Sequence, residues 1–263
     1  MLAIHQFALY LHIAIGSCAL IVFWIPVFTR KGNLNHKRFG RLFAYVMYIV
    51  SFSGIIMSSS DLLFPVAMHA PGLDLTSAEA SSVAIEVRGF ALFLLSLSIL
   101  VLNSTRQGWL TILNRDDRSA LRKPLHIALN CSLIIIGLVL FVSGLRSGSI
   151  LFMVFSVLQL VTGVNCLRYN FKEKLKPKEW WIQHLGGFIA SGIGAYTAFF
   201  VFGGRSVMNS IFGDVYSDIS IFLWVAPGVI GGIAIALTSR HYQNRFAGEW
   251  AIKHATVRSE MFS

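Results

Sequence analysis

Charged residues are scarce in this sequence of 263 residues: they make up 13% of the chain, whereas hydrophobic residues make up 55%. A typical soluble domain has about 25% charged residues, so this composition argues against a water-soluble globular protein. Cysteine is also scarce. Cys18, Cys131 and Cys166 all lie in apolar segments and form no CxxC pair, so neither a disulfide framework nor a zinc knuckle is indicated.

Apolar stretches dominate the chain instead, and seven of them are long enough to cross a bilayer as helices, which takes about 20 residues each. The predicted helices cover residues 4–28, 41–58, 86–103, 124–145, 149–167, 181–202 and 219–238. We therefore predict an all-α polytopic membrane protein with seven transmembrane helices. It consists of a transmembrane domain, residues 1–238, and a basic tail, residues 239–263.

Three parts of the chain carry further expectations about local structure. Residues 59–85 contain prolines, a Pro-Gly pair and scattered polar residues, so they are predicted to be largely irregular. Pro227 and Gly228 stand at the centre of the last apolar stretch and predict a kink or a break there. Residues 246–257 in the tail are predicted to form a short amphipathic helix lying on the membrane.

The positions of lysine and arginine predict the orientation. All of the 22 lysine and arginine residues except Arg88, Arg146 and Arg205 fall in the first, third and fifth linkers, in the tail, or at the linker end of a helix, as Arg41 does. Cytoplasmic segments carry such an excess, so the N-terminus is expected outside and the C-terminus in the cytoplasm, in a bacterial inner membrane. The net charge of +10 is then explained by topology and by contact with anionic lipid. No nucleic-acid partner is needed to account for it.

Small residues are concentrated in residues 181–202, in rows spaced by four. One row contains Gly186 and Gly194, and the next contains Gly187, Ser191 and Ala195. Such rows let another helix backbone approach closely. We therefore expect this stretch to be a central helix packed on both sides.

Polar residues inside or beside the predicted helices fall into two layers. Ionisable groups in a membrane are costly and usually face the bundle interior or a cavity, so each layer is a candidate site. The cytoplasmic layer contains His126, Asn130, Asn165 and His184, with Arg38, Arg41 and Arg122 at its boundary. The outer layer contains His12, Glu86, Arg88, Tyr196 and Thr197.

The leading functional hypothesis from these layers is redox chemistry. His126 and His184 are predicted at similar depth on two different helices. Two such histidines can bind the iron of a b-type haem, whose properties the protein tunes through its axial ligands. A membrane protein of this kind would exchange electrons with a quinone or with a protein redox partner.

A transporter or proton-coupled carrier is the first alternative. His12, Tyr196 and Glu86 could form a proton relay, because histidine titrates near neutral pH. The Pro227-Gly228 pair would supply a hinge. No acidic residue is expected at mid-depth in the predicted helices, so Ser51, Ser53 and Gln159 are the polar candidates there.

Two further alternatives remain open. A seven-span zinc hydrolase needs about three protein ligands around one point, and His36, His126 and His184 could converge at the cytoplasmic face. The last predicted helix, however, lacks the HxxxH motif expected for the ceramidase and adiponectin-receptor type. A non-catalytic accessory subunit, working in a homo-oligomer or a larger membrane complex, is the other alternative.

Three motifs resemble a bacterial family of predicted polytopic membrane proteins of unknown function. They are Leu11-His12-x-x-x-Gly16, Asn35-His36-Lys37-Arg38-x-Gly40-Arg41, and His184-Leu-Gly-Gly followed by Ala195-Tyr196-Thr197-Ala198-Phe199. The resemblance supports the seven-helix architecture. It implies functional importance for His12, His36, Arg38, Arg41, His184 and Tyr196, and it implies no particular reaction.

Overall fold

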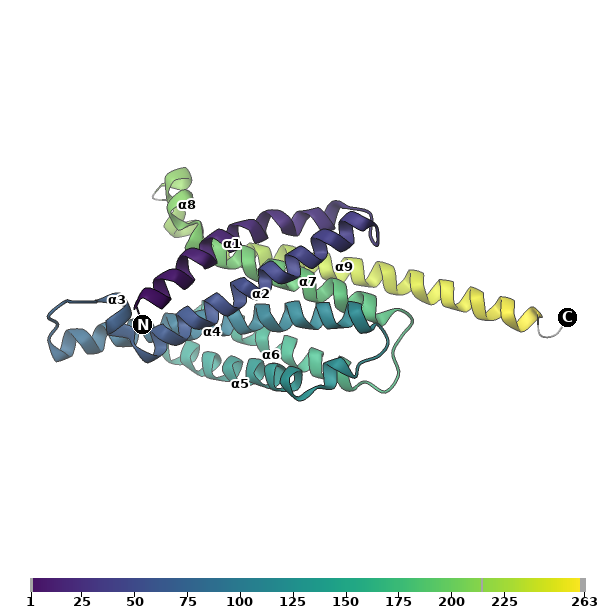
Figure 1. The fold of residues 1–263 in the computed structure, drawn as a ribbon, viewed down its shortest axis with the longest axis horizontal. Coiled ribbons are helices and arrows are strands. Elements are labelled where there is room, and N and C mark those ends of the chain that lie inside the picture. The colour runs from purple at the N-terminus through teal and green to yellow at the C-terminus, as the bar shows by residue number, and fades with distance from the viewer. Residues whose placement is uncertain (1, 214, 261–263) are drawn as a thin grey trace.

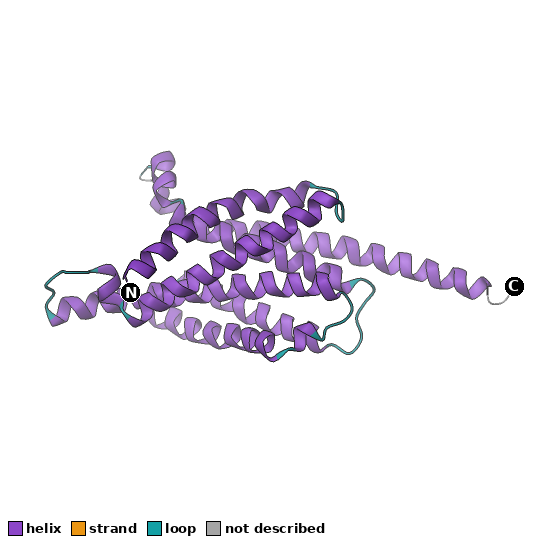
Figure 2. Cartoon of the chain, viewed as in Figure 1, coloured by secondary structure: helices purple, strands orange, loops and turns teal. Residues whose placement is uncertain are grey.

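The structure, a computed structural model, describes residues 2–213 and 215–260, and the elements in this part of the chain are helical (Figures 1 and 2). They are α1 (Leu2–Phe28), α2 (Leu34–Leu63), α3 (Pro65–His69), α4 (Ser77–Asn114), η1 (Ala120–Arg122), α5 (Pro124–Ser147), α6 (Ile150–Phe171), α7 (Glu179–Ala198), η2 (Phe199–Gly203), α8 (Arg205–Phe212) and α9 (Val215–Glu260). Here η1 is a short 3-10 helix and η2 a π-helical turn.

Seven of these helices, α1, α2, α4, α5, α6, α7 and α9, are long and apolar enough to cross a membrane. This confirms the predicted all-α class and the seven spans. The chain is thus an integral multi-pass membrane protein whose surroundings include the lipid bilayer. Its orientation and the identity of the membrane stay predictions.

Several helices are longer than the apolar stretches that predicted them. The helix expected at 86–103 extends over Ser77–Asn114, and the helix expected at 41–58 extends over Leu34–Leu63. The prediction that residues 59–85 are largely irregular is therefore wrong for most of that segment. The physical reason is that hydropathy detects only the hydrocarbon-spanning part of a helix, whereas the backbone hydrogen bonds continue into the polar zone beyond it.

The last span also differs from its prediction. Helix α9 runs as one helix from Val215 to Glu260 with Pro227 inside it, so the helix does not break at Pro227-Gly228, whereas the alternative of a kink there stays a prediction. The amphipathic helix predicted at 246–257 is the far part of this same helix, which projects beyond the bundle (Figure 1). Neighbouring groups can satisfy the backbone groups that a proline frees in a membrane helix, so the proline does not have to end the helix.

Helix α4 occupies the centre of the bundle and packs against α2, α5 and α7. Helix α1 covers α2, helix α6 covers α5, and helix α9 lies on α7 (Figure 1). The apolar core lies along α4, where Phe93 is fully buried. Its ring stacks on Phe152 at a centroid distance of 5.6 Å and meets the edge of Phe155 at 5.2 Å. Because α4 lies at the centre of the bundle, polar groups on three other helices can reach it.

Capping explains where α4 begins and how the next loop is held. Thr76 and Glu79 form a capping box, with Glu79 Oε2 2.8 Å from the Thr76 backbone nitrogen, which satisfies orphan donors at the helix start. After α4, the Arg118 guanidinium donates to the carbonyls of Tyr169, Lys172 and Glu173 at the end of α6. A cation at a helix C-terminus is favourable, so Arg118 ties the α4–α5 linker to α6.

Candidate functional site

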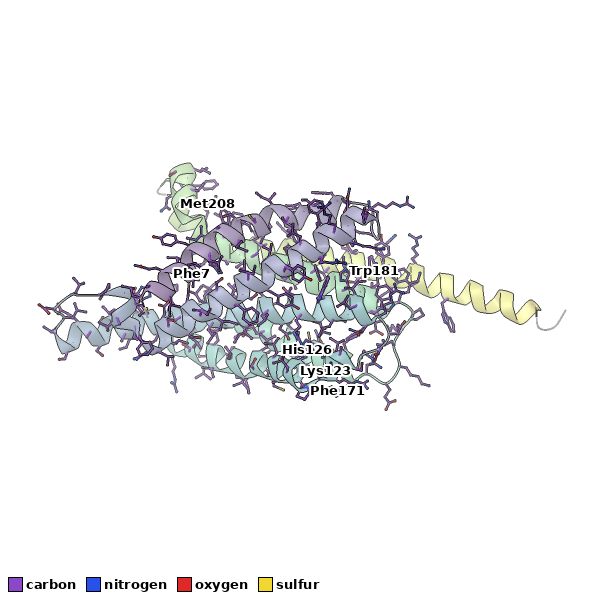
Figure 3. All side chains as sticks on the ribbon, viewed as in Figure 1. Phe7, Lys123, His126, Phe171, Trp181 and Met208 are labelled. Carbon is purple, nitrogen blue, oxygen red and sulfur yellow. The ribbon has the colours of Figure 1, made fainter. Side chains whose placement is uncertain are left out.

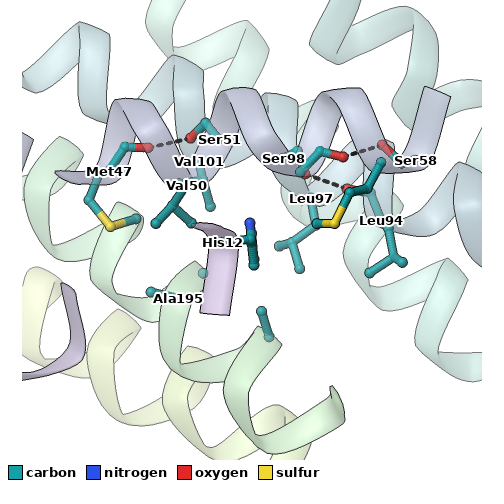
Figure 4. A pocket seen from close by; sticks show the side chains of 14 residues that line it. His12, Met47, Val50, Ser51, Ser58, Leu94, Leu97, Ser98, Val101 and Ala195 are labelled. Atoms are coloured by element: carbon teal, nitrogen blue, oxygen red, sulfur yellow. Dashed lines mark hydrogen bonds between the residues drawn. The ribbon is translucent and has the colours of Figure 1, made fainter. Parts of the chain in front are cut away.

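A cavity of about 80 Å³ lies between α1, α2, α4 and α7, near the middle of each of the first three helices (Figure 4). Apolar side chains such as Met47, Leu94 and Leu97 make up most of its wall. Its polar lining comes from His12 and from Ser51, Ser58 and Ser98. A water molecule needs roughly 10–15 Å³ of such volume, so a few waters or a very small solute would fit.

His12 enters the cavity wall from α1 and is held by α2. Its Nδ1 lies 2.9 Å from the Ser53 hydroxyl oxygen, and that hydroxyl donates to the Ile49 carbonyl at 2.8 Å. With the Ser53 proton on this carbonyl, the neutral imidazole would carry its own proton on Nδ1 and donate it to Ser53. The other nitrogen, Nε2, is then left with a lone pair, as a hydrogen-bond acceptor.

The three serines of the wall share this acceptor character. Ser51 donates to the Met47 carbonyl, Ser58 to the Gly54 carbonyl and Ser98 to the Leu94 carbonyl, at 2.6–2.8 Å. Each hydroxyl thus uses its only proton within its own helix and keeps oxygen lone pairs available. A wall of acceptors suits a solute that donates hydrogen bonds, such as water, hydronium or a small protonated amine.

A second polar cluster lies between α4, α5 and α6, in the half of the bundle where α5 begins. His126 Nε2 is 2.7 Å from the Gln107 side-chain oxygen, and the Gln107 amide donates to Asn170 at 3.0 Å. Asn130 donates to the His126 carbonyl at 2.7 Å, as expected for residues four apart on one helix face. His126, Asn130 and Asn170 are fully buried, and Figure 3 places His126 between α4 and α5.

His184 reaches α4 from another side. Its Nδ1 lies 3.1 Å from the Gly108 carbonyl, and its ring packs on Phe188 at a centroid distance of 4.8 Å. Helix α4 lies between α5 and α7 (Figure 1), so His126 and His184 meet successive residues of α4 from two different neighbouring helices. His126 would have to free Nε2 from Gln107 to present that nitrogen to an iron, whereas His184 could keep its Nδ1 contact with Gly108 while Nε2 binds. Haem b binding through this pair stays a prediction.

His36 caps the end of α1. Its Nδ1 is 3.0 Å from the Pro26 carbonyl, which also accepts a hydrogen bond from the Lys31 ammonium group at 2.8 Å. Desolvation at this position lowers the pKa of Lys31. His36 is near enough to His184 to interact with it electrostatically, whereas Arg38 and Arg41 are exposed on the first turns of α2.

The residues predicted for the outer layer do not form one site. Tyr196 donates to the Leu20 carbonyl at 2.8 Å and accepts from the Trp24 indole at 2.6 Å, so its hydroxyl is tied to a different part of α1 than His12. Thr197 is buried. Glu86 and Arg88 are exposed, and Arg88 donates to the Leu62 carbonyl at 3.1 Å.

Several polar residues of the buried clusters were not singled out from the sequence. Gln107 lies beyond residue 103, where the apolar stretch ends, so it was assigned to a linker. Asp61 fell in the segment predicted to be irregular, although it is a buried acid in the last turn of α2. Asp61 lies three residues after Ser58 and seven after Gly54, so the helix face that the three residues share is visible only once α2 is extended to Leu63.

No protein-family model, curated protein or solved structure matches the chain. The resemblance to a family of bacterial membrane proteins therefore stays a prediction. What the structure adds is a set of named contacts within a seven-span helical bundle.

Proposed function

We propose that the protein is a proton-coupled carrier of the bacterial inner membrane, with the cavity beside His12 as its binding site. The observation that supports this function best is an imidazole in the wall of a cavity placed midway along α1, α2 and α4. Ionisable residues at such depth commonly mark substrate or ion pathways. Histidine can both take and release a proton near neutral pH.

The size and lining of the cavity define the solute class. A volume of about 80 Å³ is smaller than a cavity of roughly 150 Å³ that takes up benzene. The polar atoms of the wall act as acceptors, as derived for His12 and the three serines. The cargo is therefore a proton together with a hydrogen-bond-donating solute of only a few heavy atoms.

The first test measures whether water reaches the cavity. In a cysteine-free background, Ser98→Cys is expected to react with a membrane-impermeant methanethiosulfonate reagent from at least one side of the membrane. Ser17→Cys is the matched control, because Ser17 also bonds its i−4 carbonyl but is exposed on the surface of α1. A lipid-facing thiol stays un-ionised and unreactive, so we expect at least a tenfold difference in rate. Equal rates for Ser98→Cys and Ser17→Cys, with the reagent added on either side of the membrane, would refute an accessible cavity.

The second test concerns proton movement. Purified protein in liposomes with trapped pyranine is expected to take up protons when a potassium diffusion potential is imposed with valinomycin, with water as the hydrogen-bond-donating solute. His12→Gln should reduce the rate to that of protein-free liposomes, because glutamine keeps a polar group but cannot titrate. His241→Gln, a change in the exposed part of α9, should leave the rate unchanged. Proton uptake that is absent in the wild type, or equal in His12→Gln, would contradict the proposal.

A further inference from the structure

Three side chains meet where α1 begins, α2 ends and α3 follows, a region that lies beside the N-terminus in Figure 1. His5 Nε2 lies 3.0 Å from Asp61 Oδ1, and His69 Nε2 lies 3.0 Å from the same oxygen. The two imidazole rings are 6.2 Å apart and nearly perpendicular, at 74°. Two imidazoles thus converge from different directions on one carboxylate oxygen.

The contacts are close, yet they do not have the geometry of hydrogen bonds. His5 Nε2 and Asp61 Oδ1 are both buried, and neither atom has a hydrogen-bond partner. A ring N–H donates along the plane of the imidazole, so the His5 nitrogen is not aimed at the oxygen beside it. A buried carboxylate oxygen without a hydrogen-bond partner costs free energy of folding. This indicates that a further group belongs among these three side chains.

The chemistry of the three atoms indicates what that group is. Two imidazole nitrogens and one carboxylate oxygen are ligands of zinc and of other divalent transition metals. In a tetrahedral zinc site with bonds of about 2.0–2.1 Å, neighbouring ligand atoms are about 3.3 Å apart, close to the two separations of 3.0 Å. Ligand atoms that point at a common ion lie near one another without pointing at one another. His5 Nε2 and Asp61 Oδ1 likewise lie close together without a hydrogen bond between them.

We propose that His5, Asp61 and His69 bind a divalent transition-metal ion, with water completing its coordination. Among the described residues no group of three or more His, Cys, Asp or Glu side chains could hold a metal ion in the positions that they occupy, so one ligand has to turn. His69 is that ligand, because its side chain is 44% exposed and it is the last residue of the short helix α3. His5 and Asp61 are 13% and 9% exposed and form the fixed half of the site.

Metal binding would join α1, α2 and α3 at the end of the bundle where α1 begins, where few other polar contacts link them. Arg88 already fixes the end of α2 through the Leu62 carbonyl. An ion shared by His5, Asp61 and His69 would add a link from α1 to both α2 and α3. This inference is independent of the carrier proposal, since it uses neither His12 nor the cavity.

Zinc binding to purified protein without a histidine tag tests the proposal. Titration calorimetry with Zn²⁺ alone should give one equivalent per chain for the wild type. Asp61→Asn and His69→Ala should weaken binding at least about tenfold, as even second-shell changes can, whereas His241→Ala should bind like the wild type. Circular dichroism must show unchanged helix content; His69→Ala is the safer variant because His69 is the more exposed ligand.

A Co²⁺ spectrum gives a second readout. Co²⁺ in place of Zn²⁺ should show visible d–d bands of low-symmetry coordination, and these bands should disappear in His69→Ala. A wild-type protein that binds no zinc would overturn the proposal, because the three side chains would then bind only one another or protons. Equal binding by the wild type, Asp61→Asn and His69→Ala would overturn it as well, by placing the metal elsewhere.

Discussion

Gly187→Ala is expected to destabilise the protein by about 1–3 kcal/mol or more, the cost of overpacking a close contact. A Cβ at Gly187 would lie 2.7 Å from the Ser104 carbonyl oxygen and 2.8 Å from backbone atoms of Gly108. These are backbone atoms of α4, so no side chain can rotate away to make room. The midpoint of unfolding in mixed detergent micelles, with sodium dodecyl sulfate as denaturant, measures the effect.

Gly186→Ala is the matched control and should act in the opposite direction. A Cβ at Gly186 meets nothing within 4 Å, and alanine favours a helix over glycine by up to about 1 kcal/mol. We therefore expect Gly186→Ala to unfold at the same or a slightly higher denaturant fraction than the wild type. If the two variants unfold together, α4 and α7 do not pack through Gly187.

The second large effect is expected from Gln107→Leu. Leucine has a similar volume but would leave His126 Nε2 and Asn170 Oδ1 without the partner that each has in Gln107. An unsatisfied buried polar group costs about 1–3 kcal/mol, so two of them predict a loss of about 2–6 kcal/mol in the free energy of unfolding. The same micellar unfolding experiment measures it.

Gln243→Leu is the matched control for Gln107→Leu, because it makes the same change at an exposed glutamine. Gln243 is exposed on α9, so Gln243→Leu should change the free energy of unfolding by less than about 0.5 kcal/mol. A Gln107→Leu variant as stable as Gln243→Leu would mean that the hydrogen bonds of Gln107 contribute no net stability. It would also mean that His126 and Asn170 find other partners.

The fold was predictable from the sequence because each span is a long uninterrupted apolar run. The row of small residues at Gly187 correctly indicated a close helix contact, since Gly187 meets the backbone of α4. Helix ends were harder to predict. Asn103, Gln107 and Thr111 are buried in α4, but their polarity lowers the hydropathy in the same way as that of a solvated linker, so the apolar run appeared to stop.

The candidate sites were predictable only where both partners share one helix. The spacing of His126 and Asn130 predicted a common face, and the two residues are hydrogen-bonded. The pairing of His12 with Ser53 depends on how α1 crosses α2, and no spacing within either helix contains that information. The convergence of His5, Asp61 and His69 likewise depends on three separate elements, and both Asp61 and His69 fall in the segment that was predicted to be irregular.

The length of helix α9 limits how closely another molecule can approach the bundle. Its 46 residues correspond to a rod of about 69 Å at 1.5 Å per residue, more than twice the roughly 30 Å of a hydrocarbon core. Trp181 packs on Tyr242 and Phe246 of α9, at centroid distances of 4.3 and 5.6 Å, which fixes where the rod leaves α7. From Phe246 to Glu260 the helix adds about 21 Å beyond that aromatic contact. A neighbour that approaches this end of the molecule therefore meets the rod before it reaches the bundle, so α9 sets the minimum clearance on that side of the membrane.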